Sequence, residues 1–250
     1  MNQTAQTPST ILGSLSPEEE IALLSRGWRK AEVRRIAEHL KQEKYQDIWD
    51  AIGKREASFI AGPLLWLTAH TFTEDQHWMA KGTPAIARFP RKSYLSVVMQ
   101  YLLSEPTLFI PKSREMMTSW LVCGYIAWMC QWHPHMFWVV QTDKEDKVIS
   151  LVNYCRILWR RQPEWMQKRC PLVVDNTTEL SYGNGSRIIG VPKGENQVRL
   201  YHPYGYVSDE AAFQPEFREC FNAVRPVAKQ IIAVSSDEMG PFHDECRLIG

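Results

Sequence analysis

Apolar residues in the N-terminal part of the chain recur at intervals of three and four, which is the spacing of one face of an α-helix. Ser16, followed by a proline and three glutamates, is typical of a helix start, and the pattern then runs to Lys54 with glycines at 27 and 53. The apolar positions of this stretch are Ile21, Leu24, Trp28, Val33, Ile36 and Leu40.

A short apolar segment over residues 57–67 follows, and residues 70–92 are rich in loop-forming residues. The N-terminal residues 1–10 are polar and uncharged. We therefore predict a disordered tail over residues 1–15, a helical N-terminal region over residues 16–85 and a separate domain over residues 86–250.

In the second half of the chain short apolar runs alternate with longer amphiphilic stretches. Asp143 is expected to cap one of the helices, and Gly183-Asn-Gly185 is typical of a hairpin turn between residues 179–182 and 186–191. Strands alternating with helices predict an α/β fold with a mainly parallel sheet. The expected helices cover residues 94–103, 119–132, 143–159 and 213–224, and the other expected strands cover 107–110, 135–140, 197–200, 204–208 and 230–235.

Composition narrows the class of protein. The net charge is +1, so there is no strong overall field to attract nucleic acid or a membrane. The six cysteines show no CxxC spacing, which favours reduced thiols. The longest apolar run, residues 120–129, is about half of the roughly 20 residues that a membrane span needs. We expect a soluble, intracellular protein without a membrane partner.

The strand over residues 107–110 leads into a basic, hydroxyl-containing loop that ends at Ser119. The loop lacks the pattern G-x-x-x-x-G-K-[ST]: it has no glycine, and Thr118 stands in the place of the lysine. Phosphate binding nevertheless requires only helix N–H groups, a cation and a hydroxyl for Mg²⁺. Thr118 or Ser119 supplies the hydroxyl and Lys112 or Arg114 the cation, although an ordinary basic turn has the same residues.

Asp209 and Glu210 follow a second apolar run. An aspartate there can hold Mg²⁺, and a glutamate can orient and deprotonate an attacking water. An acidic pair in the first turn of a helix is the alternative interpretation. A third run ends in Ser235-Ser236, where hydroxyls either sense the state of a phosphate or simply begin a turn.

Taken together, these segments resemble the large terminase subunit of tailed bacteriophages, the ATP-driven DNA-packaging motor. The resemblance covers about residues 60–250. It is carried by the order and spacing of residues 110–120, 182–192, 207–215 and 234–243. It implies a P-loop NTPase-like fold of the additional-strand, catalytic-glutamate type, with a mainly parallel sheet flanked by helices.

The resemblance also implies roles for individual residues. Glu210 corresponds to the catalytic base, and Arg114 to the arginine that stabilises γ-phosphate charge. Lys112 corresponds to a displaced Walker A lysine, while Ser119 and Asp209 correspond to the Mg²⁺-binding hydroxyl and the Walker B aspartate. Other implied positions are nucleotide contacts at Ser113 and Thr118, adenine contacts at Phe89 and Tyr94, and a coupling motif at Ser235 and Ser236.

The implied activity is ATP hydrolysis with Mg²⁺, driving viral DNA into a procapsid. The implied partners are double-stranded viral DNA, the portal protein, the small terminase subunit and further copies of the chain in a ring, in the cytoplasm of a bacterial host of a phage or prophage. A large terminase continues into a nuclease domain, which is absent from this sequence, so no nuclease activity is expected.

The sequence departs from the family at Glu115, where glutamine is frequent, and at Met117, where glycine is common. These departures support an alternative function. In that alternative the degenerate loop no longer turns over ATP, and the chain is a non-catalytic assembly or DNA-binding module.

Overall fold

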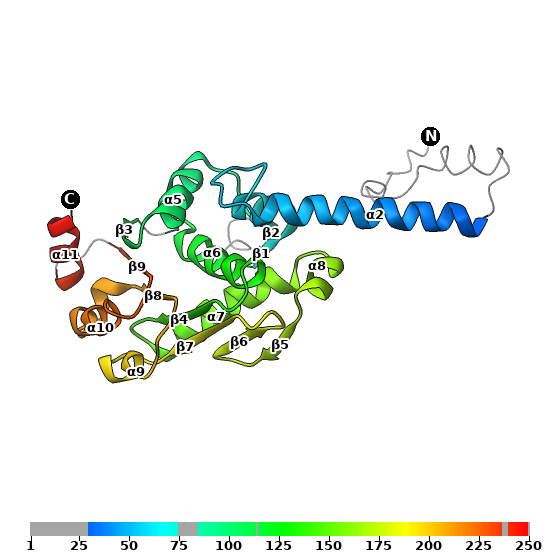
Figure 1. Cartoon of the computed structure of the whole chain (residues 1–250). Coiled ribbons are helices and arrows are strands. Elements are labelled where there is room, and N and C mark those ends of the chain that lie inside the picture. The colour runs from blue at the N-terminus through cyan, green and yellow to red at the C-terminus, as the bar shows by residue number, and fades with distance from the viewer. Residues whose placement is uncertain (1–29, 75–84, 114, 237–239, 250) are drawn as a thin grey trace. The chain divides into compact units, whose positions relative to one another are not determined.

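The computed structural model describes residues 30–74, 85–113, 115–236 and 240–249 (Figure 1). The chain divides into two compact units, Met1–Lys54 and Arg55–Gly250. The described part of the first unit is one helix, α2 (Lys30–Gly53), which confirms the helical pattern there and ends one residue before Lys54, to which the pattern was expected to run. The predicted tail over residues 1–15 and the predicted helix start at Ser16 lie outside the described residues, and the predicted domain boundary at residue 86 stays a prediction.

The second unit combines one large sheet and one small one with helices. None of the described helices is both long and apolar enough to cross a membrane. The helices are α3 (Pro63–Leu65), the π-helix η1 (Trp66–His70), α5 (Ser93–Ser104), α6 (Thr118–Trp132), α7 (Glu145–Arg160), α8 (Glu164–Arg169), α9 (Glu195–Arg199), the 3₁₀ helix η2 (Ala211–Phe213), α10 (Phe217–Val224) and α11 (Pro241–Ile249). The strands are β1 (Phe72–Glu74), β2 (Ile86–Arg88), β3 (Thr107–Lys112), β4 (Phe137–Gln141), β5 (Leu172–Asp175), β6 (Glu179–Tyr182), β7 (Arg187–Val191), β8 (Gly205–Asp209) and β9 (Gln230–Ser236).

The large sheet has seven strands in the order β3-β9-β8-β4-β7-β6-β5. Its first five strands are parallel, and β6 and β5 extend it in antiparallel fashion. β1 and β2 form a separate antiparallel pair. The predicted class, a mainly parallel sheet flanked by helices, is confirmed.

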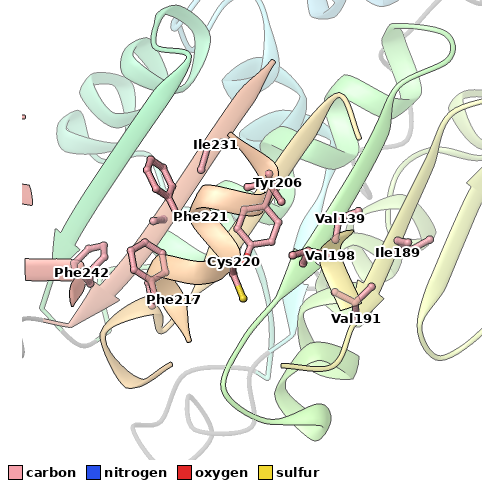
Figure 2. Packing of buried hydrophobic residues seen from close by; sticks show 13 residues of the cluster. Val139, Ile189, Val191, Val198, Tyr206, Phe217, Cys220, Phe221, Ile231 and Phe242 are labelled. Carbon is pink, nitrogen blue, oxygen red and sulfur yellow. The ribbon is translucent and has the colours of Figure 1, made fainter. Parts of the chain in front are cut away.

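Successive residues of β4 show how the two faces of the sheet are covered. The Trp138 ring packs against Tyr125 of α6, with ring centroids 5.9 Å apart. The next residue, Val139, points to the opposite face, where it joins a buried cluster that includes Phe217 and Phe221 of α10 (Figure 2). Helix α6 therefore lies on one face, and α10 lies on the other.

Helix α6 is apolar on all sides, as the unbroken apolar run in its sequence predicts. The sheet covers one side of it, and α3, η1 and α5 lie nearby on another. Gly124 permits the close approach, because a Cβ atom at that position would lie 2.6 Å from the side chain of Leu67. This packing fixes the helix whose first turn carries Thr118 and Ser119.

Three sequence-based expectations are wrong in detail. Residues 197–200 do not form a strand, because Gln197 lies within the short helix α9. Asp143 does not cap α7: its carboxylate accepts hydrogen bonds from Thr142 and Lys147, and Lys144 occupies the cap position. Helix α10 begins at Phe217, since the residues expected to form its first turn belong to η2 and the following turn.

Candidate functional site

The site is assembled by the parallel strands, whose carboxyl ends meet at one edge of the sheet. β9 lies between β3 and β8, with Lys112 in register with Ser236 and Asp209 in register with Val234. Residues that are about 90 positions apart in the chain are thereby brought together, as in the ligand-binding crevices of other open α/β sheets.

Ser119 and Asp209 form the centre of the site. The Ser119 hydroxyl donates to the Asp209 carboxylate, with oxygen–oxygen distances of 3.0 and 3.2 Å. Asp209 is only 7% exposed. Burial raises its pKa to about 6, and the neighbouring Glu210 carboxylate adds to this, while Lys112 and the Ser119 hydroxyl oppose it. A buried carboxylate beside a hydroxyl offers the oxygen donors that Mg²⁺ prefers, and a bound cation would offset the cost of ionising it.

Lys112 and Glu210 form an ion pair at the same edge, with 3.5 Å between Nζ and Oε1. Glu210 has a left-handed backbone conformation (φ 53°), which turns the chain sharply after β8. Such a conformation is costly for a residue with a side chain and is concentrated at functional sites. The proposed lysine and the proposed base are therefore already adjacent.

The loop between β3 and α6 adopts two left-handed turns without a glycine, at Glu115 (φ 63°) and Met117 (φ 55°). Each costs on the order of 1 kcal/mol. The Tyr94 hydroxyl donates to the carbonyl oxygen of Met116 at 3.0 Å and so supports the loop from α5. Among the described residues, the N-cap residue Met117 makes no side-chain hydrogen bond to the first turn of α6, and the backbone N–H groups of a helix start are the kind of group that binds anions.

A buried hydrogen-bond network holds the turn that carries Glu210. Gln214 donates from Nε2 to the Ser208 hydroxyl and to the carbonyl oxygen of Asp209, both at 2.9 Å. The Ser235 hydroxyl accepts a hydrogen bond from the backbone N–H of Ala212 at 3.0 Å. Ser235 thus connects β9 directly to the turn. Sequence reasoning missed Gln214, because nothing in its local pattern distinguishes it from a surface glutamine.

The remaining expected residues lie around this centre. Thr118 is the buried first residue of α6, and Ser236 ends β9 opposite Lys112. Ser113 lines a cleft shared with α11. Phe89 is 2% exposed and lines a cleft of about 390 Å³ together with Arg88 and Arg91 of the segment before α5, so its adenine contact stays a prediction. Arg114 lies outside the described residues.

The raised pKa of Asp209 leads to a prediction about pH. Mg²⁺ requires the ionised carboxylate, so Mg²⁺-dependent nucleotide binding is expected to strengthen as the pH rises from 5 to 7 and to level off above that. Titration of binding at several pH values, with and without Mg²⁺, measures this.

Asp209→Asn supplies the baseline for that experiment, because nucleotide phosphates also titrate near pH 6. Lys112 and Glu210, the charged groups that face Asp209, are unchanged in this variant. A wild-type profile that runs parallel to that of Asp209→Asn would contradict the assignment of Asp209 as a Mg²⁺ ligand.

Comparisons with known proteins give a likeness in structure alone. No family model matches the sequence, and no curated protein matches it. The HK97 bacteriophage large terminase superposes with a TM-score of 0.51 at 9% identity, over 70% of this chain and 36% of that one. The ATPase domain of the Thermus phage P74-26 large terminase gives a TM-score of 0.43 at 12% identity, over 69% of this chain and 73% of that one. The chain therefore has, over about 70% of its length, the fold found in a tailed-phage large terminase.

Proposed function

We propose that this chain is an ATPase motor domain of the large-terminase type, which hydrolyses ATP to drive DNA translocation. The observation that carries the proposal is the pairing of Ser119 with Asp209 at 3.0 Å, at the start of the helix that follows a strand and its loop. The ion pair between Lys112 and Glu210 at the same edge supports it. A hydroxyl, two carboxylates and a cation at the carboxyl ends of neighbouring strands are the groups that phosphoryl transfer to water requires.

Each residue has a chemical task in this proposal. The N–H groups of α6 and the Lys112 ammonium bind the phosphates, and Ser119 and Asp209 hold the metal ion. Bound Mg²⁺ would neutralise charge on the phosphates. Glu210 accepts a proton from the attacking water, and Ser235 and Gln214 fix the turn that orients it. Arg114 is proposed to stabilise charge on the γ-phosphate.

The turns of the glycine-free loop bear on the alternative, non-catalytic function. Glu115 and Met117 adopt the left-handed conformations that glycine would take more easily. Strain of this kind persists when the surrounding structure requires it, which favours a retained phosphate loop over an ordinary turn. A non-catalytic assembly or DNA-binding module, which does not hydrolyse ATP, remains the second candidate function. It is retained because Glu115 and Met117 stand where glutamine and glycine are common in the family.

The partners are proposed on the same basis. The matched region spans 36% of the HK97 large terminase, so activities of the whole HK97 protein are not transferred directly. We propose double-stranded viral DNA, a portal protein, a small terminase subunit and further copies of this chain in a ring as partners, and the cytoplasm of a bacterial host as the location.

The test is a titration with a fluorescent ATP analogue, with and without Mg²⁺. Lys112→Ala is expected to weaken Mg²⁺-dependent binding about 10-fold or more, since a charge-assisted hydrogen bond to phosphate contributes roughly 1.5–3 kcal/mol. Lys168→Ala removes an exposed lysine on α8 and is the matched control. Absence of binding at millimolar nucleotide, or equal affinity of Lys112→Ala and wild type, would overturn the proposed phosphate site.

A further inference from the structure

A basic cleft opens beside the candidate site, between the end of β3 and helix α11. Its volume is about 430 Å³. One side is formed by Pro111, Lys112 and Ser113, and the other by Phe242, His243, Cys246 and Arg247. We call it the α11 cleft. Because Lys112 belongs both to this cleft and to the ion pair with Glu210, the cleft adjoins the proposed nucleotide site.

Two sets of contacts fix the orientation of α11. The Phe242 ring packs into the aromatic cluster of the sheet, with centroids 5.7 Å from Phe109 and 5.9 Å from Phe217 (Figure 2). On another side of the helix, Arg218 of α10 pairs with Glu245 at 3.3 Å and with Asp244 at 3.9 Å. The acidic side chains of α11 are thus held toward α10.

The basic side chains occupy the remaining face. His243 and Arg247 are four residues apart, so they lie on one side of α11, and both line the cleft. Arg247 is exposed, and among the residues that the structure describes no hydrogen bond or ion pair involves it. Within the described part of the chain, its guanidinium therefore has no carboxylate to displace before it binds a ligand.

The charges of the candidate site explain why a further cation would be needed there. Lys112 is partly neutralised by Glu210, and Asp209 adds a further acidic group. A nucleoside triphosphate carries several negative charges, and phosphoryl transfer is accelerated by cations placed around the transferred group. Arginine suits this task, because its planar fork can donate two hydrogen bonds to phosphate oxygens.

We propose that Arg247, supported by His243, is a further cation of the nucleotide site beside Lys112 and Arg114, and that it binds the terminal phosphates of the triphosphate from the α11 cleft. The inference rests on the proposed function and adds to it a specificity for triphosphate over diphosphate. Helix α11 follows β9 in the chain, and Ser235 of β9 holds the turn that carries Glu210. The positions of Arg247 and of the proposed base Glu210 are therefore both linked to β9.

The test compares the affinities of Mg²⁺–ATP, Mg²⁺–ADP and inorganic triphosphate for wild type, Arg247→Ala, Arg247→Lys and Lys112→Ala. Arg247→Ala is expected to weaken ATP and triphosphate binding about 10-fold and ADP binding by less than about twofold, with Arg247→Lys in between. Arg225→Ala is the matched control, because Arg225 is an exposed arginine directly after α10 that lies 6.0 Å from the Phe221 ring and does not line the α11 cleft. Thermal unfolding verifies that each variant is folded.

The outcomes separate this inference from the proposed function. If wild type binds ATP and Lys112→Ala weakens this binding while Arg247→Ala does not, the proposed role of Arg247 is refuted and the nucleotide site stands. Equal losses for ATP and ADP refute the specificity for the terminal phosphate. If no nucleotide binds to wild type, the proposed function fails, and Arg247-dependent binding of a short DNA duplex would then reassign the cleft to DNA phosphates.

Discussion

Glu210→Gln is expected to bind ATP at least as tightly as wild type and to lose hydrolysis by a factor of about 10² to 10⁴. The amide keeps the shape of the side chain but cannot accept a proton from water. Its neutral group also no longer pairs with Lys112, which is 3.5 Å from the carboxylate in the wild-type structure. Lys112 is then free to bind phosphate, so affinity is not expected to fall.

Single-turnover hydrolysis with saturating Mg²⁺–ATP, together with the binding titration, checks this prediction. Glu219→Gln is the control, since Glu219 is an exposed carboxylate on α10, near in sequence but outside the site. A Glu210→Gln variant that hydrolyses ATP as fast as the control would remove Glu210 from the role of base. Loss of binding together with hydrolysis would instead indicate a structural role for the ion pair.

Gly205→Ala is expected to lower the free energy of unfolding by about 1–3 kcal/mol, the usual cost of overpacking a core. Gly205 begins β8, and a Cβ atom there would lie 2.2, 2.4 and 2.5 Å from three atoms of the Trp138 ring. That ring is fully buried between α6 and the sheet, so it has no open space into which to move. Chemical denaturation of both proteins measures the difference.

A double-mutant cycle with Trp138→Phe tests the cause. The smaller ring removes the atoms that the new methyl group would meet, so Gly205→Ala is expected to cost less in the Trp138→Phe background than in wild type. Trp138→Phe alone also removes an indole N–H that has no hydrogen-bond partner among the residues that the structure describes. Additive effects of the two substitutions would show that the cost of Gly205→Ala comes from elsewhere, for example from the backbone of β8.

The sequence by itself determined where along the chain most of the strands and helices of the parallel part of the sheet lie. The strands β3, β4, β8 and β9 were located because burial on both faces of a parallel strand requires a continuous apolar segment. The helices α6 and α7 were located from a long apolar run and from an amphipathic pattern, respectively. The candidate residues Lys112, Ser119, Asp209 and Glu210 were found because each follows such a segment, and the structure brings these four together.

The sequence alone was not sufficient to predict short helices and strands at the edge of the sheet. β5 (Leu172–Asp175) was missed, because its position at the sheet edge leaves Val173 65% and Val174 36% exposed and weakens the alternating pattern. Residues 197–200 were predicted as a strand because a five-residue helix such as α9 is too short to show a helical period. Local pattern does not settle such segments, since tertiary packing outweighs their intrinsic preference.

Tertiary structure alone decided which strand ends are neighbours. No spacing in the sequence indicates that β9 lies between β3 and β8, yet this order puts Ser235 beside the Glu210 turn and Lys112 beside Glu210. The same holds for the proposed role of Arg247 of α11, which depends on the cleft that it lines together with the distant end of β3. Apolar periodicity reports only whether a segment is buried and on which face, whereas a site depends on which buried segments lie side by side.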